Sequence, residues 1–311
     1  MKIGLDIMGG DFAPRATVLG AIAAQKALSA DQKIVLFGDK DQVLPILAEQ
    51  GVNPDVFEFV HTTEVIGMGE HGTKSVLQKP NSSISLGYQY LKDGKIDSFA
   101  SAGNTGAMLV GAIFSVKPVP GVIRPAVATN VPKLKSGFGI MLDVGANADC
   151  KPEVLAQFGI LGSLYAEHVY NLSNPKVALM NIGEEEEKGN VLTQATFPLL
   201  QKTNLNFVGN IEGRDLFNDR ADVIVCDGFT GNVMLKLAET FYILTLKKGF
   251  KDEFFDRFNY EQYGGSPILG INAPVLIGHG ISSPEAIKNM VLLSRTMIES
   301  GFIDKVKEAF K

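Results

Sequence analysis

Short apolar runs alternate with segments of helical period along almost the whole chain. Several runs contain no polar residue, as in Val223–Cys226. Unbroken apolar runs are typical of strands covered on both faces, and regular alternation with helices favours a largely parallel sheet. The pattern predicts an α/β fold with strands at Lys2–Met8, Lys33–Phe37, Val56–Val60, Asp97–Ala102, Phe138–Val144, Lys176–Asn181, Asn206–Gly209, Asp222–Cys226 and Val275–Ile277.

Seven of the apolar runs stop at a cluster of Gly with Asp, Asn, Ser or His. The clusters are Asp6–Asp11, Ser101–Gly106, Asp143–Asn147, Asn181–Gly183, Gly209–Gly213, Asp227–Asn232 and Gly278–Gly280. Glycine permits tight turns and close approach of a ligand, and a following helix directs unpaired N–H groups toward an anion. A tight turn explains any one cluster equally well. Seven such turns on one side of a sheet predict a large polar site.

Two proline positions mark helix starts. Asp11 precedes Pro14 and Ser283 precedes Pro284, so each acidic or hydroxyl side chain is a candidate N-cap. The only break in composition is a segment of mixed aromatic and charged residues from Phe241 to Tyr263. We therefore expect a single domain over residues 1–311, with a short helical protrusion at about 241–263.

The protrusion carries a row of aromatic residues. Phe250, Phe254, Phe255 and Phe258 are spaced so that one helix would present them on one face. Such a helix would pack on its own domain or on a second subunit. The alternative is a surface helix for a membrane or a partner.

Composition narrows the class of protein. The chain has 311 residues, 45% of them hydrophobic, and a net charge of −5, so it lacks the basic excess of proteins that bind nucleic acid. Cys150 and Cys226 are the only cysteines, which excludes a disulfide framework and favours a reducing cytoplasm. The most apolar stretch, Ala107–Val116, is far shorter than the roughly 20 residues that span a bilayer. We expect a cytoplasmic protein without a signal peptide.

One glycine motif is misleading. Gly67, Gly69 and Gly72 have the spacing of a dinucleotide fingerprint, but the preceding strand ends near Val60 and Pro80 would stop a following helix, so the context is wrong. No metal-binding signature and no nucleophile elbow occurs, and we expect neither a cofactor nor a metal. Among the four histidines, His279 is the functional candidate because it lies between two glycines after an apolar strand.

The turns offer a particular chemistry. Amide, hydroxyl and backbone N–H groups dominate Ser101–Gly106 and Asp227–Asn232, which is the composition of an anion or oxyanion site. Arg15, Lys236 and other cations nearby would supply charge for a phosphate.

The turn sequences resemble the motif set of the PlsX family of phosphate acyltransferases. The resemblance rests on Asp6–Pro14, Ser101–Ala107, Leu142–Asn147, Asn181–Glu185 and Asp227–Val233, together with Tyr263–Gly265 and His279–Gly280. It implies transfer of a long fatty acyl group from acyl carrier protein to inorganic phosphate, giving acyl phosphate for phospholipid synthesis. It also implies a three-layer α/β/α fold like that of isocitrate and isopropylmalate dehydrogenases, a homodimer, and delivery of the product to a membrane-bound glycerol-phosphate acyltransferase.

On this resemblance we assign roles to the turns. Asn104, Asn232 and His279 are the catalytic candidates, with His279 protonating the departing thiolate or orienting phosphate. Asp6 and Asp11 hold loops more plausibly than they do chemistry, and the apolar residues Met108–Phe114 are a candidate acyl groove. The substrate-binding candidates are Gly9, Gly10, Asp11, Arg15, Ser101, Gly103, Thr105, Gly106, Asp227, Gly228, Thr230, Gly231 and Lys236.

Two departures from the family pattern affect these assignments. Leu77 stands where an arginine is common, so Lys74 or Lys79 would have to replace that cation. The segment before Tyr263 is also shorter than in many relatives, which leaves membrane contact through Phe250–Phe258 open.

Two other functions remain as alternatives. One is a nicotinamide-dependent decarboxylating dehydrogenase of the same fold, and the other is a non-catalytic scaffold of lipid synthesis.

Overall fold

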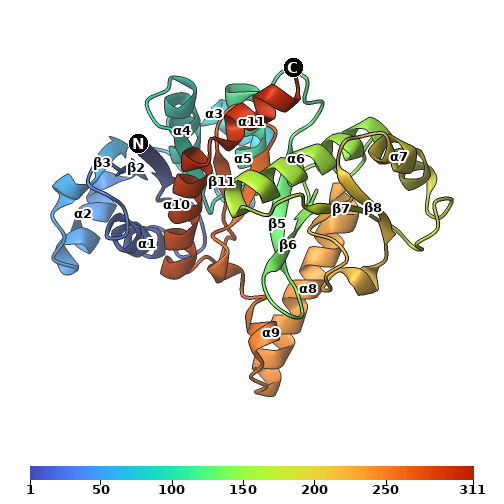
Figure 1. Cartoon of the computed structure of the whole chain (residues 1–311). Helices are drawn as coiled ribbons and strands as arrows, with labels where there is room; N and C mark the ends of the chain where they lie inside the picture. Colours follow the sequence, from blue (N-terminus) through green and yellow to red (C-terminus); the bar gives the residue numbers. More distant parts are fainter. The chain divides into compact units, whose positions relative to one another are not determined.

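The computed structural model describes residues 1–311, apart from the side chain of Tyr260. The chain forms two compact units (Figure 1). Unit 1 comprises Met1–Pro118 and Tyr260–Glu299, and unit 2 comprises Val119–Asn259 and Ser300–Lys311. Each unit has its own run of strands, its own covering helices and its own buried core.

The sheet of unit 1 is parallel except at one edge. Its strands are β1 (Lys2–Asp6), β2 (Lys33–Gly38), β3 (Glu58–His61), β4 (Ser98–Ser101), β10 (Ser266–Leu269) and β11 (Val275–Ile277), in the order β3-β2-β1-β4-β11-β10. Only β10 runs antiparallel to its neighbour β11. The carboxyl ends of β1, β4 and β11 therefore lie side by side.

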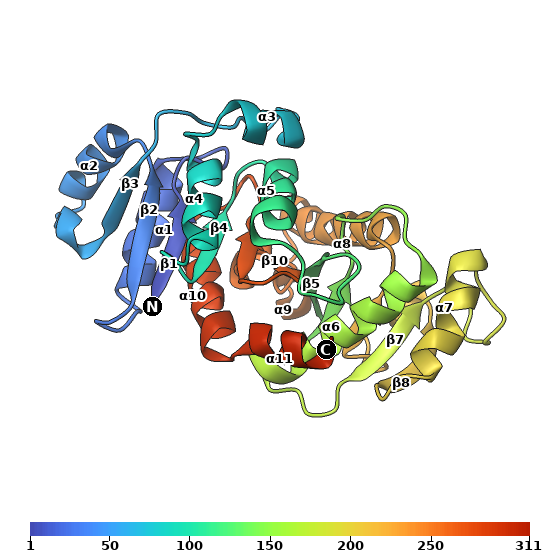
Figure 2. The same cartoon turned by 90° about the horizontal axis from the view of Figure 1, so that it is seen from above.

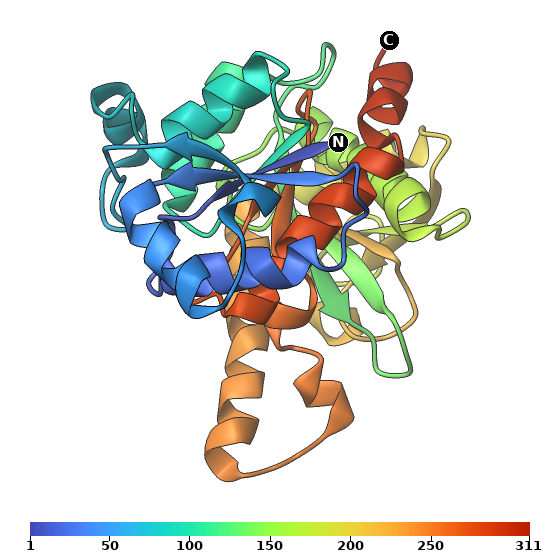
Figure 3. The same cartoon turned by 90° about the vertical axis from the view of Figure 1, so that its left-hand side faces the viewer.

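Helices cover both faces of this sheet (Figure 3). One face carries α1 (Arg15–Gln25), α2 (Lys40–Glu49) and α10 (Pro284–Glu299), and the other carries α4 (Ser83–Lys92) and α5 (Thr105–Gly111). The short helix α3 (Gly72–Gln78) packs on α5. Single turns complete the unit at η1 (Pro54–Val56), η2 (Ala112–Val116) and η4 (Tyr260–Gln262).

Unit 2 repeats the arrangement with a different strand order. The strands are β5 (Ala126–Pro132), β6 (Phe138–Leu142), β7 (Lys176–Met180), β8 (Asn206–Ile211) and β9 (Val223–Val225), in the order β5-β6-β9-β7-β8. Only β5 is antiparallel, to β6. One face carries α6 (Pro152–Tyr170), with α7 (Val191–Gln201) and α11 (Phe302–Ala309) packed on it, and the other carries α8 (Gly228–Lys248) (Figure 2). The short elements η3 (Gly213–Asp215) and α9 (Glu253–Asp256) complete the unit.

These elements confirm the predicted fold class. All nine expected strands are present, with ends that differ by a few residues. The two strands that the sequence did not reveal are β5 and β10, which are also the antiparallel ones. Asn130 and Pro132 interrupt the apolar pattern of β5, and Pro267 interrupts that of β10.

One helix start was predicted correctly and one was not. Ser283 Oγ accepts a hydrogen bond from Ala286 N at 3.3 Å, as an N-cap does. Asp11 does not cap α1, whose N-cap is Pro14. The backbone N–H of Asp11 instead donates to Gly280 O at 2.7 Å, because the turn after β1 packs on the turn after β11.

The expected single helical face of four phenylalanines is wrong. Helix α8 ends at Lys248, and Gly249 follows with φ of 70°, which turns the chain before α9 begins. Phe254 and Phe258 pack on Phe217 of the same unit, with ring centroids 6.0 and 5.1 Å apart, whereas Phe250 remains 68% exposed. Among the described helices, none combines the length and the apolar character needed to cross a bilayer.

Candidate functional site

Three of the predicted turns meet in unit 1. They follow β1, β4 and β11, which are adjacent and parallel. Direct backbone hydrogen bonds join them, from Gly278 N to Ser101 O at 2.8 Å and from Asp11 N to Gly280 O at 2.7 Å. The structure thus brings Asp6–Asp11, Ser101–Gly106 and Gly278–Gly280 into one cluster, which we call the unit 1 cluster.

A buried carboxylate holds the cluster together. Asp6, at the end of β1, is 1% exposed. Its Oδ2 accepts from Ser101 Oγ at 2.7 Å and its Oδ1 accepts from Met8 N at 2.9 Å. Ser101 Oγ in turn accepts from Gly103 N at 2.9 Å. Burial raises the pKa of Asp6, and the hydrogen bond from Ser101 opposes that shift most strongly.

Glycine is required where two turns touch. A Cβ atom on Gly9 would lie 2.5 Å from Asp6 Oδ2 and 2.6 Å from Gly103 N, closer than real contacts allow. Gly10 has φ of 101°, a conformation that favours glycine. Gly9, Gly10 and Gly103 therefore permit the close packing of the cluster.

Both ends of the Asn104 side-chain amide form hydrogen bonds within the fold. Its Oδ1 accepts from Ala107 N at 2.9 Å, which caps α5. Its Nδ2 donates to the carbonyl oxygens of Gly67, Met68 and Glu70 at 2.8–3.1 Å. A direct catalytic role for Asn104 stays a prediction, while its contacts favour positioning of the neighbouring turn.

The glycine motif at residues 67–72 belongs to the loop that accepts the Asn104 hydrogen bonds, rather than to a dinucleotide site. It lies in a loop between β3 and the seven-residue helix α3. Glu70 closes the loop by accepting from Gly67 N and from Ser75 Oγ. Lys79 donates to Glu70 Oε1 at 2.6 Å, and this hydrogen bond lowers the pKa of Glu70 to about 2.

The unit 1 cluster also presents accessible groups. Asp11, Thr105 and Gly106 are exposed, and His279 is half-buried. The Nδ1 of His279 accepts from Ile281 N at 3.4 Å, a contact that in the neutral ring favours the tautomer with its proton on Nε2. The buried polar groups of the cluster thus fix its shape, while these accessible groups face outward.

Most of the expected cations are already paired. Arg15 forms a two-point ion pair with Glu49 at 2.6 and 2.8 Å, and Lys236 pairs with Glu239 at 2.8 Å. Lys79 is held by Glu70. Lys74 is exposed and forms no ion pair with any side chain that the structure describes. Lys74 and Lys79 were the two residues proposed to supply the positive charge that Leu77 lacks. Of these, Lys74 is the one available to an anion.

The four other predicted turns lie at one edge of the sheet of unit 2, at the carboxyl ends of the parallel strands β6, β9, β7 and β8. The predicted Gly209–Gly213 turn begins inside β8, which runs to Ile211. Asp143 is buried there and accepts from Val127 N, Ala146 N and Asn147 N at 2.6–3.1 Å. Burial raises its pKa, against the effect of these hydrogen bonds. Asp143 thus fixes the turn after β6 through buried hydrogen bonds, as Asp6 fixes the turns of the unit 1 cluster.

The Asp227 turn packs directly on the Asp143 turn. Asp227 caps α8 by accepting from Thr230 N and Thr230 Oγ1, both at 2.9 Å. Gly228 N donates to Asn147 O at 2.8 Å, and a Cβ atom on Gly231 would lie 2.0 Å from Asp143 O. Gly228 and Gly231 are therefore packing positions, whereas Asn232 is exposed beside Gly145.

One acidic group has the geometry of a metal site. The carboxylates of Glu184, Glu212 and Asp215 lie within 4.8 Å of one another. Arg220 forms ion pairs with Glu184 and Asp215 at 2.6 and 3.4 Å, and Arg214 pairs with Glu212. These arginines already balance the negative charge, so the three carboxylates and two arginines form an ion-pair network.

Sequence reasoning missed the role of Asp143 and of Glu70. The signal for Asp143 was present, because the residue directly follows the apolar end of β6, and Asp6 likewise ends the apolar run of β1. The role of Glu70 depends on contacts with Lys79 and Ser75 that no sequence pattern reveals.

Comparison with known proteins identifies the family. The model of the family described as fatty acid synthesis protein matches residues 1–305. The phosphate acyltransferase of Dictyoglomus turgidum is 43% identical over 329 aligned positions, covering 99% of this chain and 97% of that protein. The phosphate acyltransferase of Desulforamulus reducens is 43% identical over 330 positions, covering 100% of this chain and 98% of that protein.

Solved structures agree on the fold. A phosphotransacetylase from Streptococcus pyogenes matches with a TM-score of 0.70 at 15% identity, covering 96% of this chain and 94% of that one. A 4-hydroxythreonine-4-phosphate dehydrogenase from Klebsiella pneumoniae matches with a TM-score of 0.54 at 12% identity, covering 96% and 99%. At these identities the likeness concerns the fold alone. The full-length match to the family model and to its relatives shows that the chain belongs to the fatty acid synthesis protein family, the PlsX family of phosphate acyltransferases.

Proposed function

We propose that this enzyme transfers a long-chain fatty acyl group from acyl carrier protein to inorganic phosphate, giving acyl phosphate for phospholipid synthesis. The observation that carries the proposal is the unit 1 cluster. Its buried carboxylate, hydroxyl and amide groups hold three turns together, and its accessible groups are Asp11, Thr105, Gly106 and His279. This composition suits capture of a phosphate better than attack by a protein nucleophile.

The chemistry of the reaction demands little acid or base strength. The second pKa of phosphate is close to neutral, by analogy with phosphoryl groups at about 6, so much of the phosphate is already a dianionic nucleophile. The leaving thiolate has a pKa of about 8.5 if it resembles a cysteine side chain. The enzyme must therefore place phosphate against the thioester and stabilise the oxyanion that forms.

Each accessible group has a place in this scheme. The Thr105 hydroxyl and the backbone N–H groups of Thr105 and Gly106 would bind phosphate oxygens. His279, with its proton on Nε2, would donate to phosphate or to the departing thiolate. Asn104 would act by positioning the Ser101–Gly106 turn rather than by contact.

The Asp227–Asn232 turn would bind the oxyanion or the second face of phosphate, with Asn232 as its accessible amide. Arg15 and Lys236 would contribute charge only after release from Glu49 and Glu239. Lys74 is exposed without an ion pair to a described side chain, which supports it as the more available source of charge. In this proposal the two units act together as one catalytic domain of a homodimer in the cytoplasm, which delivers acyl phosphate to a membrane-bound glycerol-phosphate acyltransferase.

The test combines two readouts of one reaction. The protein is incubated with palmitoyl carrier protein, with and without phosphate, and free thiol and hydroxamate-trapped acyl phosphate are measured. We expect equal amounts of both products, and only when phosphate is present. Thiol release that does not depend on phosphate would identify a thioesterase and overturn the proposal.

The role of His279 has its own variant and control. We expect His279→Ala to lower kcat for acyl phosphate formation by 10²-fold or more, the range typical of a positioned proton donor. His61→Ala is the matched control, because His61 is an exposed histidine of the same unit that accepts a hydrogen bond from Lys40 N. If His279→Ala stays within a few-fold of the wild type, the histidine has no part in the chemistry.

A further inference from the structure

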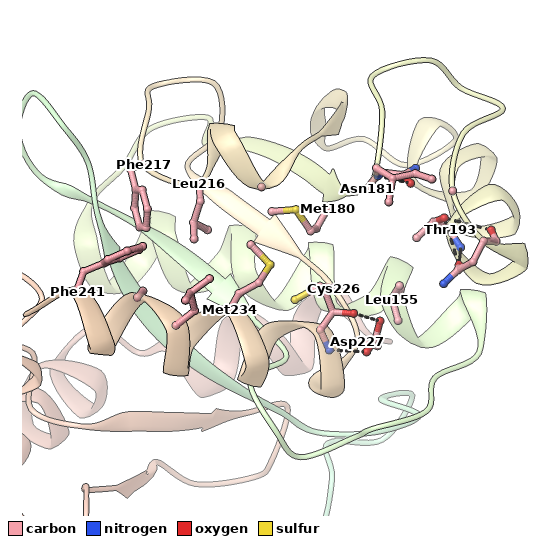
Figure 4. A pocket seen from close by; sticks show the side chains of 17 residues that line it. Leu155, Met180, Asn181, Thr193, Leu216, Phe217, Cys226, Asp227, Met234 and Phe241 are labelled. Carbon is pink, nitrogen blue, oxygen red and sulfur yellow. Dashed lines mark hydrogen bonds between the residues drawn. The ribbon is translucent and has the colours of Figure 1, made fainter. Parts of the chain in front are cut away.

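Unit 2 contains a pocket whose walls include residues of three predicted turns, at Asn181, Gly213 and Asp227. Its volume is about 700 Å³, within the range of about 300–1,000 Å³ that is typical of ligand sites. Its walls come from α8, from the end of β7, and from the segment Gly213–Phe217. Figure 4 shows these side chains lining one continuous space above α8.

The two ends of the pocket differ in chemistry. Figure 4 shows Phe217 and Phe241 at one end, Met180 and Met234 near the middle, and Asp227 with Asn181 and Thr193 toward the other end. Apolar and polar groups are thus segregated along the pocket. A ligand that matches it has an apolar tail and a polar head.

Helix α8 sets the length of the pocket. Asp227, Thr230, Met234, Ala238 and Phe241 all line it, and their spacing of three and four residues places them on one face of the helix. At 1.5 Å per residue, the distance along the helix from Asp227 to Phe241 is about 21 Å. A pocket of this length suits an extended chain rather than a compact ring.

The apolar wall is adaptable and partly open. Met180 and Met234 have unbranched, flexible side chains that fit ligands of irregular shape. Leu237 and Phe241 line the pocket and are 58% and 38% exposed, so an apolar ligand would remove their side chains from water. Cys226 contributes only an inert apolar surface, because burial raises the pKa of its thiol.

We propose that this pocket holds the fatty acyl chain of the substrate, with the carbonyl end at the Asp227 turn and the tail at Phe241. The proposal rests on the proposed function, because the Asp227 turn is one of its substrate-binding turns. It is an alternative to the acyl groove expected at Met108–Phe114, where Met108 and Ala112 are fully buried while Ile113 and Phe114 are 40% and 71% exposed. The Oη of Tyr88 also donates a hydrogen bond to Met108 O.

A single tryptophan reports on the tail end. The chain contains no tryptophan, so Phe241→Trp introduces one fluorophore at a site that already holds an aromatic ring. The control is Ile243→Trp, because position 243 lies about 200° around the helix from position 241 and does not line the pocket. We expect a fatty acid brominated in its chain to quench Phe241→Trp at least threefold more than Ile243→Trp, and the unbrominated acid to quench neither.

A second variant tests the same site through activity. Ala238→Phe adds bulk to the pocket wall about one helical turn before Phe241, and Ile243→Phe is its control. We expect kcat/KM for 16- and 18-carbon acyl carrier proteins to fall at least tenfold in Ala238→Phe, while the value for an 8-carbon chain stays within threefold of wild type. The control should keep the wild-type profile at every chain length.

The outcomes separate this proposal from the proposed function. If the wild type forms acyl phosphate but bromine quenches both tryptophans alike and Ala238→Phe keeps the wild-type chain-length profile, the chain lies elsewhere. The fluorescence emission of Phe241→Trp could instead be unchanged by the fatty acid and vary with protein concentration. That result would assign the pocket to a subunit interface. Failure of phosphate-dependent thiol release by the wild type would overturn the proposed function, whereas quenching would still test the pocket.

Discussion

Ser101→Ala tests whether the unit 1 cluster is held by its buried hydrogen bonds. The substitution removes the hydroxyl that donates to Asp6 Oδ2 at 2.7 Å and accepts from Gly103 N at 2.9 Å. Asp6 would lose one of the donors to its buried carboxylate, with Met8 N remaining on Oδ1, and the N–H of Gly103 would lose its acceptor. No water replaces them easily, because Asp6 and Ser101 are at most 1% exposed.

The expected magnitude follows from the two lost contacts. A hydrogen bond to a charged group contributes about 1.5–3 kcal/mol, and an unpaired buried N–H costs about 1–3 kcal/mol. Since these terms overlap, we expect the free energy of unfolding to fall by about 3 kcal/mol. For a unit of this size that corresponds to a decrease in Tm of roughly 6–12 °C.

The assay is calorimetric and urea-induced unfolding of the full chain, with Ser98→Ala as the matched control. Ser98 lies on the same strand and is equally buried, but its Oγ has no hydrogen-bond partner among the described residues. Removing an unpaired hydroxyl should change stability little. Equal effects of the two substitutions, within about 0.5 kcal/mol, would refute the role of the Ser101 hydroxyl.

The pH dependence gives a second check on the same contact. Burial raises the pKa of Asp6 above its usual 3.8, and the Ser101 hydroxyl opposes the shift, so Ser101→Ala should raise this pKa further. The cost of the substitution is largest where Asp6 is ionised, above its folded pKa. It should shrink as the pH falls through the folded pKa of Asp6, which burial places above 3.8, because protonated Asp6 no longer needs a donor to a negative charge. A cost that grows on acidification would contradict this assignment.

Three further predictions concern other positions. Gly9→Ala should lower Tm and raise KM for phosphate, because its Cβ would lie 2.6 Å from Gly103 N; unchanged values would show that the turns move apart freely. The hydrogen bond from Lys79 lowers the pKa of Glu70 from 4.5 to about 2, so stability from this pair is present above pH 4.5 and is lost as the pH falls toward 2. Glu70→Gln should therefore flatten the acid limb of a plot of Tm against pH, and an unchanged limb would assign the acid sensitivity to other carboxyls. Burial raises the pKa of Cys150 from 9.0 to about 11, so a disulfide reagent at pH 8 should label it about 100-fold more slowly in the folded chain than in denaturant; labelling at equal rates would refute a protected thiol.

The fold class could be predicted from the sequence, because strands that are buried on both faces contain mostly apolar residues. Val223–Cys226 is such a run, and its first three residues form the central strand β9 of unit 2. Strands β5 and β10 were not predicted, because Asn130 and Pro267 break their apolar pattern. These antiparallel strands depend on pairing with their neighbours rather than on a continuous apolar sequence.

The candidate site could be predicted only in part from the sequence. Sequence placed polar turns after the strands, and the parallel order of β1, β4 and β11 brings three of them together. It did not separate the groups that hold the turns from those that face outward. Asn104 is the clearest example, because its amide oxygen accepts from Ala107 N and its amide nitrogen donates to the loop at Gly67–Glu70. The second contact joins segments more than 30 residues apart.

The sequence by itself determined the alternation of strands and helices, the positions of the polar turns and membership of the family. These properties depend on local period and on residue type, which the linear order preserves. The tertiary structure decided which turns touch, which carboxylates are buried and which cations are already paired. It also decided that an elongated apolar pocket lies along α8. Those properties arise from side chains distant in sequence that share one environment, and no local pattern encodes that proximity.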